Sequence, residues 1–276
     1  MTLEGRPHRE VVEFIANDPA IRARVKAGLA AEPGHREAEA RYLAEAGDLL
    51  AELVKLLPPV RELTWVGQLR HLVVPADGQA GKAKPLDYRA AVPLLLERLR
   101  QVRNYRLAHE LVAVLSVAFA KKQARPVFLE LFRDPPDVDA DQRESVRRTL
   151  ASGLADFTDQ TVADEHIQLV GDPAYGSARQ PLVATLAKTK DPRVPQVLVS
   201  LVDDPDVAEA AVVALGKLRP AAARPRLERA LEDSNPAVQR EAAKVLKKLH
   251  LPSPSSAPKA MFREAPQPSL PHRHLF

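Results

Sequence analysis

Apolar residues recur along this chain with the spacing of one face of an α-helix, and the same pattern returns several times. It is clearest in the segments 204–218 and 235–249, which align without gaps. Each begins with Asp or Asn followed by Pro, which is typical of a helix N-cap and first helical position. Three further segments, 107–120, 142–155 and 177–190, repeat the pattern. All five align on one leucine: Leu115, Leu150, Leu186, Leu215 and Leu246.

A shorter apolar segment precedes each of these predicted helices. Four of the short segments carry a proline near their start: Pro93, Pro126, Pro195 and Pro225. In the remaining one, Asp164 stands at that position. Because proline is well tolerated in the first turn of a helix, each unit is predicted to be a short helix, a turn and a longer helix. One such hairpin cannot bury its own apolar face, so we expect the units to stack side by side.

The chain before residue 88 is helical but not repetitive. Helices are predicted over the ranges 9–17, 19–31, 35–57 and 60–72. The last of these carries Trp65, which we interpret as a core or cap residue, with a half-exposed binding role as the alternative. Residues 75–87 have the composition of a flexible connection. We expect residues 1–72 to form a helical cap on the first repeat; a separate small helical domain is the alternative.

The C-terminal segment is rich in Pro and Ser, and we do not expect it to fold alone. It nevertheless contains Phe262, Leu275 and Phe276. These apolar residues either anchor the tail in a partner's groove or cover the exposed face of the last repeat. The predicted organisation is a cap and linker over 1–87, about five hairpins over 88–250, and a flexible tail over 251–276.

Two-helix units of about 30 to 36 residues that read Asp-Pro-x-Val-x-x-Ala-x-x-Ala-Leu-Gly resemble HEAT repeats. They are most similar to the short bacterial type found in phycobilisome-lyase-like proteins. This resemblance implies an all-α fold, a right-handed α-solenoid of the armadillo type, with the second helices lining its concave side. The family usually places Arg directly after the Val, bonded to a turn Asp. Arg143 and Arg179 occupy that position, but Ala208 and Gln239 take it in the two best repeats, so an unbroken Asp–Arg ladder is not expected.

Charge adds a candidate surface. The chain has a formal net charge of +4, and the predicted second helices are net basic whereas the first helices are net acidic. We therefore expect a mildly basic groove for an acidic segment of another protein, with ordinary solvated charge as the alternative. The basic residues do not form a continuous row, because Glu209 and Val213 occupy the positions in one repeat that Arg240 and Lys244 occupy in the next. The candidate binding residues are Arg143, Arg147, Arg179, Arg240, Lys244, Phe262, Leu275 and Phe276.

Catalytic chemistry finds little support in the sequence. There is no cysteine, which excludes thiol catalysis and Cys-ligated metals, and we expect no metal or cofactor. Asp164, Glu165 and His166 are adjacent, so on a helix they point in different directions; we interpret them as a solvated helix start. Four Tyr and one Trp are poor material for base stacking, which argues against nucleic acid as the partner.

The sequence thus predicts a non-enzymatic protein-binding adaptor. Its start lacks a secretory leader, and no apolar stretch is long enough for a bilayer, so we expect a cytoplasmic protein away from the membrane. The alternatives are a nucleic-acid-binding solenoid, supported by the basic balance, and a lyase-like accessory subunit, supported by resemblance alone.

Overall fold

The computed structural model describes residues 33–75 and 83–250, and within these ranges it contains eleven α-helices and one small sheet. The helices predicted over 9–17 and 19–31, and the tail over 251–276, lie outside the described residues. A long helix, α3 (Pro33–Leu56), comes first. None of the described helices combines the length and apolar character that crossing a membrane requires.

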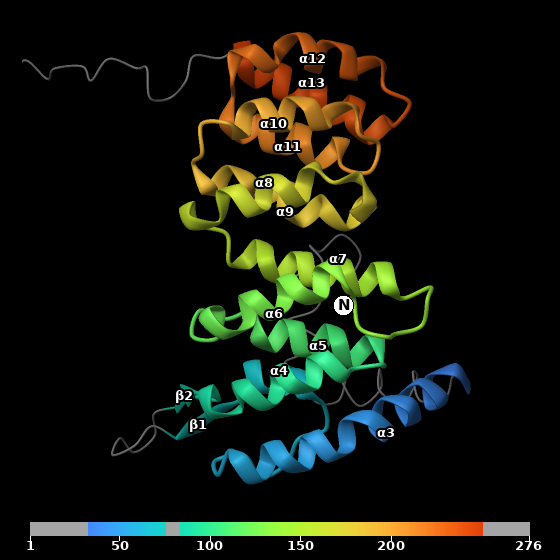
Figure 1. The fold of residues 1–276 in the computed structure, drawn as a ribbon, viewed down its shortest axis with the longest axis vertical. Coiled ribbons are helices and arrows are strands. Elements are labelled where there is room, and N and C mark those ends of the chain that lie inside the picture. Colours follow the sequence, from blue (N-terminus) through green and yellow to red (C-terminus); the bar gives the residue numbers. More distant parts are fainter. Residues whose placement is uncertain (1–32, 76–82, 251–276) are drawn as a thin grey trace, which may run out of the picture.

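Five helical hairpins follow α3 and stack along the long axis of the molecule (Figure 1). In chain order the hairpins are α4 (Val92–Gln101) with α5 (Tyr105–Leu115), α6 (Lys121–Arg133) with α7 (Arg143–Asp156), α8 (Ala163–Gly171) with α9 (Gln180–Thr185), α10 (Val194–Ser200) with α11 (Ala208–Leu218), and α12 (Arg224–Arg229) with α13 (Pro236–His250). Short 3-10 helices adjoin them: η2 (Arg89–Ala91), η3 (Gln160–Val162), η4 (Pro173–Arg179), η5 (Leu186–Thr189), η6 (Leu201–Asp203), η7 (Ala221–Ala223) and η8 (Ala230–Glu232).

The hairpins form two layers. Each second helix packs on the next one, in the order α5, α7, α9, α11 and α13, and each first helix packs on the second helix of its own hairpin. The leucines that aligned the five units in the sequence are all buried, with exposed fractions of 0% for four of them and 8% for Leu246. The prediction of an all-α solenoid built from stacked helical hairpins is therefore confirmed.

The ends of several helices differ from the predicted ones. The segment 107–120 is not one helix, because α5 ends at Leu115 and Ser116 leaves helical geometry. The segment 177–190 is divided between η4, α9 and η5. Helix α6 begins at Lys121, which places Pro126 inside it rather than in its first turn. Asn235 caps α13 as expected, since its Oδ1 accepts the backbone N–H of Ala237 at 2.9 Å. The matching expectation for Asp204 is wrong, because α11 begins only at Ala208 and its N-cap is Val207.

The segment after α3 differs most from expectation. Instead of a helix over 60–72 there is only η1 (Val66–Arg70), and Trp65, 36% exposed, lays its ring across Gly67. The connection expected to be flexible has paired ends: β1 (Val73–Pro75) and β2 (Ala83–Pro85) form an antiparallel pair. The two β-branched residues of β1, Val73 and Val74, favour an extended backbone, and pairing with β2 satisfies the backbone hydrogen-bonding groups of that strand.

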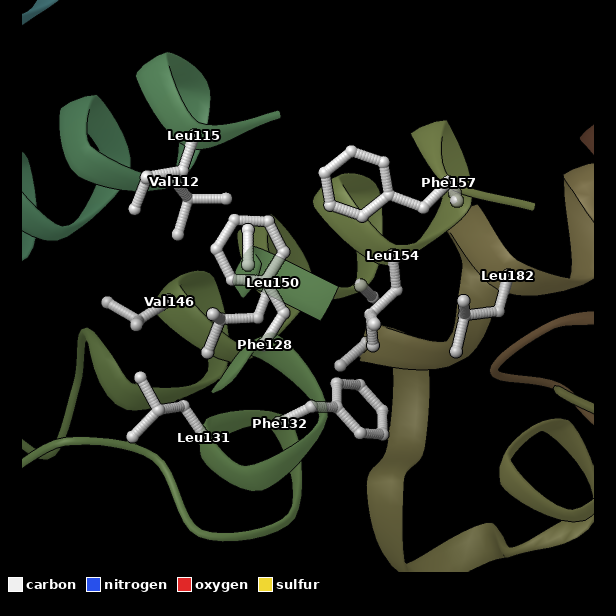
Figure 2. Packing of buried hydrophobic residues seen from close by; sticks show 14 of the residues in the cluster. Val112, Leu115, Phe128, Leu131, Phe132, Val146, Leu150, Leu154, Phe157 and Leu182 are labelled. Carbon is white, nitrogen blue, oxygen red and sulfur yellow. The ribbon is translucent and has the colours of Figure 1, made fainter. Parts of the chain in front are cut away.

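One apolar cluster runs through all the hairpins. Its bulkiest part lies between α6 and α7, where Figure 2 shows Phe128 beside Leu150 and Phe132 near Leu154. Phe128 also stacks on Phe157 with the ring centroids 5.8 Å apart. Large side chains fit here because the facing helix carries a glycine, Gly153, at the point of closest approach.

We predict that Gly153→Ala destabilises the protein. A Cβ at this position would lie 2.5 Å from Cε2 of Phe128 and 2.9 Å from Oγ of Ser116, inside a packed core. Such overpacking costs about 1–3 kcal/mol, which exceeds the helix propensity that alanine gains over glycine. Thermal unfolding followed by circular dichroism measures the effect. The control is Gly47→Ala on the exposed side of α3, where nothing lies within 4 Å; a loss of equal size there would contradict the packing explanation.

Candidate functional site

The exposed side of the second helices forms a surface that spans all five hairpins. We define the second-helix face as the positions six before, two before and two after the aligned leucine in each unit. These are His109, Ala113, Val117, Glu144, Arg148, Ser152, Gln180, Ala184, Lys188, Glu209, Val213, Lys217, Arg240, Lys244 and Lys248, and all of them are exposed or half-buried. Because the second helices pack on one another in unbroken order, this face is continuous along the molecule.

Several polar side chains on this face link neighbouring repeats. Nη2 of Arg148 donates to Oγ of Ser177 at 2.6 Å, and Nε2 of Gln180 donates to the Asp206 carbonyl at 2.7 Å. Nζ of Lys217 donates to the Ala184 carbonyl at 3.3 Å. These links add to the apolar packing that joins the second, third and fourth hairpins. The charge of the face is net basic, with six Lys or Arg against two Glu.

Of the candidate binding residues, Arg240 and Lys244 lie exposed on the second-helix face, four residues apart on α13. Lys244 also forms an ion pair with Glu241 at 2.6 Å. Arg143 is the exposed first residue of α7, and its Nη2 lies 4.0 Å from Oδ1 of Asp137 in the preceding turn. Phe262, Leu275 and Phe276 lie outside the described residues.

Arg147 is placed differently, because it is half-buried and makes structural contacts. Its Nε donates to the carbonyl of Phe132 at the end of α6, at 3.0 Å. Its guanidinium lies over the ring of Tyr175, 5.7 Å from the centroid, and that ring also contacts Phe132. Arg147 therefore joins the second hairpin to η4 of the third.

Arg179 does not lie at the surface. Its side chain is only 1% exposed, and Nη2 forms an ion pair with Oδ2 of Asp204 at 2.9 Å. Nε donates to the Gly176 carbonyl at 2.8 Å, and Nη1 to the Val170 carbonyl at 3.0 Å. A guanidinium buried with these partners is inaccessible to another molecule, so the interpretation of Arg179 as a binding residue is wrong. It connects its own repeat to the turn Asp of the next.

The equivalent positions in the other repeats do not continue this pairing. Gln239 donates from Nε2 to the carbonyl of Asp233 in its own turn at 2.6 Å, and Ala208 has no polar side chain. As expected from the sequence, the Asp–Arg ladder is broken. Among the described repeats, Arg179 makes the connection between turns with a buried ion pair.

A different set of ion pairs links successive first helices, and the sequence interpretation missed it. Arg100 of α4 pairs with Glu130 of α6 at 3.1 Å. Arg125 of α6 pairs with Glu165 of α8 at 2.5 Å. Further along, Arg193 pairs with Asp164 at 2.5 Å, and Arg226 pairs with Asp203. The signal that could have revealed them is opposite charge about one repeat length apart on the predicted first helices.

These pairs also explain Asp164 and Glu165, which start α8 as predicted. Their neighbour His166 was expected to be solvated with them, but it is fully buried. Its contact is a long one, 3.4 Å between Nδ1 and Oγ1 of Thr158. Desolvation, reinforced by the nearby charge of Arg125, lowers the pKa of His166 from its ordinary 6.5 to about 4. The described residues contain no group of three or more His, Asp or Glu that could hold a metal ion.

A buried network fastens α3 and η1 to the first repeat. The hydroxyl of Tyr42 donates to Oε2 of Glu110 at 2.6 Å, and both groups accept from the backbone N–H of Val66 at 3.1 Å. Arg106 lies over the Tyr42 ring and pairs with Glu39 at 2.8 Å. Burial and the carboxylate of Glu110 raise the pKa of Tyr42, so this hydroxyl stays a donor. The sequence held no signal for this network.

Comparison with known families gives one finding. Residues 202–264 match the family model of HEAT repeats. The matched range begins in η6 and includes the last two second helices together with the turn Asp204. Searches of the curated proteins and of the solved structures found no match. Arrays of this kind generally bind other proteins along the extended surface that their stacked units create.

We predict that Arg179→Met lowers the free energy of unfolding by about 3–5 kcal/mol, because it leaves Asp204 and two buried carbonyls without their partner. Chemical denaturation measures the change. Arg143→Met removes the same charge from an exposed site and is expected to cost less than about 1 kcal/mol. Equal effects of the two substitutions would contradict the structural assignment of Arg179.

We also predict that the protein loses stability as the pH falls from 6.5 towards 4. In this range the unfolded chain binds a proton at His166, whose unfolded pKa is near 6.5, but the folded chain does not. Acid therefore favours unfolding, by up to about 3 kcal/mol from this residue. Burial lowers the pKa of His109 as well, so His109 contributes in the same direction.

Denaturant titrations at pH 7 and pH 5 measure this dependence. His166→Asn is expected to flatten it, whereas the exposed control His71→Asn is expected to leave it unchanged. An undiminished pH dependence in His166→Asn would show that the acid sensitivity comes from other groups.

Proposed function

We propose that this chain, a HEAT-repeat protein, is a non-enzymatic scaffold that binds another protein along its second-helix face. The observation that carries the proposal is the unbroken row of second helices from α5 to α13, which exposes one continuous surface across five hairpins. Such a surface recognises a partner by shape and by weak contacts spread over several repeats.

The side chains of the face suit a polypeptide partner. Its middle positions include three small or apolar residues, Ala113, Ala184 and Val213, which let a partner approach the helices closely. The other two middle positions, Arg148 and Lys244, are basic, as are three of the five positions that follow the aligned leucines, and these charges favour an acidic segment in the partner. The links between repeats lower the entropy that binding has to overcome, because the helices are already held in place.

The nucleic-acid alternative rests on the basic charge alone. Single-stranded nucleic acid is held by aromatic platforms between basic residues, and none of the fifteen positions of the face is Phe, Tyr or Trp. The lyase-like alternative rests on family resemblance alone; among the described residues, the adjacent Asp164, Glu165 and His166 serve packing and ion pairing. The face itself therefore favours a protein partner.

The proposal is tested by capturing partners from native lysate on the full chain, with and without nuclease, followed by mass spectrometry. The test variant reverses three exposed basic charges of the face that are not among the links between repeats: Lys188→Glu, Arg240→Glu and Lys248→Glu. We expect a discrete protein to be recovered whether or not nuclease is present, and to be lost in this variant.

The matched control reverses three exposed charges of the same sign on first helices: Lys122→Glu, Arg133→Glu and Arg229→Glu. It is expected to retain the partner, and both variants are checked for unchanged helical signal. Recovery of nucleic acid, with every captured protein lost after nuclease treatment, would overturn the proposal in favour of the nucleic-acid alternative. Equal loss in both variants would show that only overall charge matters.

A further inference from the structure

A second candidate site lies at the other end of the molecule from α13, where α3 meets the turn between α4 and α5. Two adjoining cavities, of about 400 and 290 Å³, share Arg41, Glu45 and Arg103 in their linings. The larger one is also lined by Arg98 of α4, and the smaller one by Tyr105 and Asp139. Because they share lining residues, the two cavities adjoin, and we call them together the α3 cleft.

Three guanidinium groups of this cleft lack a bond or ion pair to any described residue: those of Arg41, Arg98 and Arg103. They come from a helix of the N-terminal segment, from the first helix of the first hairpin and from the following turn. Arg106, at the edge of the smaller cavity, is different because Glu39 and Glu110 neutralise it. A cleft in which three unpaired cations converge attracts an anionic ligand.

Glu45 limits which anions can bind in the cleft, because it already occupies backbone donors there. Its two carboxylate oxygens accept the backbone N–H groups of Arg103 and Asn104, each at 2.8 Å. The side chain of Asn104 in turn accepts the N–H of Leu107. Three backbone donors around the start of α5, a place that elsewhere can hold a phosphate, are therefore already occupied. What the cleft still offers is three guanidinium groups, whose planar geometry suits carboxylates.

We propose that the α3 cleft binds an acidic segment of a polypeptide, with Arg41, Arg98 and Arg103 each receiving a carboxylate. Two adjoining cavities, with arginines from α3, from α4 and from the turn before α5, suit an extended chain with several Asp or Glu residues better than one compact anion. Glu45 holds the turn against α3 and so fixes the position of Arg103. The exposed ring of Tyr105 supplies an apolar wall beside the charged groups.

This inference rests on the proposed scaffold function and adds a second contact with an acidic segment, at the α3 cleft, which we expect to be the stronger one for a peptide rich in Glu. The charge of the second-helix face points to the same ligand chemistry, so the two surfaces have to be compared directly. The comparison uses the full chain and a fluorescently labelled peptide rich in Glu, with a matched peptide in which every Glu is replaced by Gln.

Fluorescence anisotropy at low and at physiological salt measures the affinity. The cleft variant is Arg41→Gln, Arg98→Gln and Arg103→Gln; since these side chains have no partner to lose, we expect its thermal midpoint to be unchanged. The matched variant removes the same charge from the second-helix face on α13: Arg240→Gln, Lys244→Gln and Lys248→Gln. We expect the cleft variant to bind the Glu peptide about tenfold more weakly and the α13 variant to stay within about twofold of the original chain.

Other results overturn the inference. Loss of binding in the α13 variant alone would move the acidic contact to the second-helix face, which leaves the scaffold function standing. If both variants bound the Glu peptide equally weakly, the attraction would come from overall charge and not from a site. The same conclusion would follow if the unaltered chain bound the Gln peptide as tightly as the Glu peptide. Failure of the unaltered chain to bind the Glu peptide would also reject the inference. Tighter binding of a single-stranded oligonucleotide through the same three arginines would replace the polypeptide with a nucleic acid.

Discussion

The packing of each second helix on the next is the interaction on which the rest of this structure depends. A single hairpin of about 30 residues has too little apolar surface to fold alone, so each unit completes its core only through its neighbours. The contact is closest where small residues meet large ones. Gly216 of α11 lets Val245 of α13 approach, which brings two successive second helices together. Within the second hairpin, Gly153 likewise lets Phe128 fill the space between α6 and α7. The steric fit at such points sets the distance between neighbouring helices, and with it the form of the exposed face.

Electrostatic contacts favour a particular register between the stacked helices, but they supply only a small part of the stability of the stack. The pairs between first helices are exposed on at least one side in most cases, and each such pair contributes only about 1 kcal/mol or less. Their effect is to favour one register between neighbouring helices. Arg179 is the exception, because its ion pair with Asp204 is shielded from water and two carbonyls complete its coordination. It therefore links the third and fourth hairpins more firmly than the exposed pairs link the others.

A feature could be predicted from the sequence when the residues that produce it lie close together along the chain. Helical spacing, the aligned leucines and the cap at Asn235 depend on neighbours within a few residues, and these predictions are confirmed. The burial of Arg179 and His166, the pairing of β1 with β2, and the network of Tyr42 with Glu110 depend on partners brought in by folding. A short pattern does not encode such partners. The family position of Arg179 did predict its turn Asp contact, and the error lay in treating the same residue as available to a partner.

The two proposed surfaces differ in origin, and that difference bears on specificity. The second-helix face is a product of repetition, so similar positions recur in every hairpin and recognition along it is distributed. The α3 cleft arises once, where a non-repeating helix meets the first hairpin and Glu45 seals the start of α5. A unique site at the end of a repetitive surface can fix the register in which an extended partner lies, because the partner cannot slide along the repeats without leaving the cleft. The charged cleft would then fix where one end of the partner lies, and the shape of the second-helix face would fix the path of the rest of the partner along the repeats.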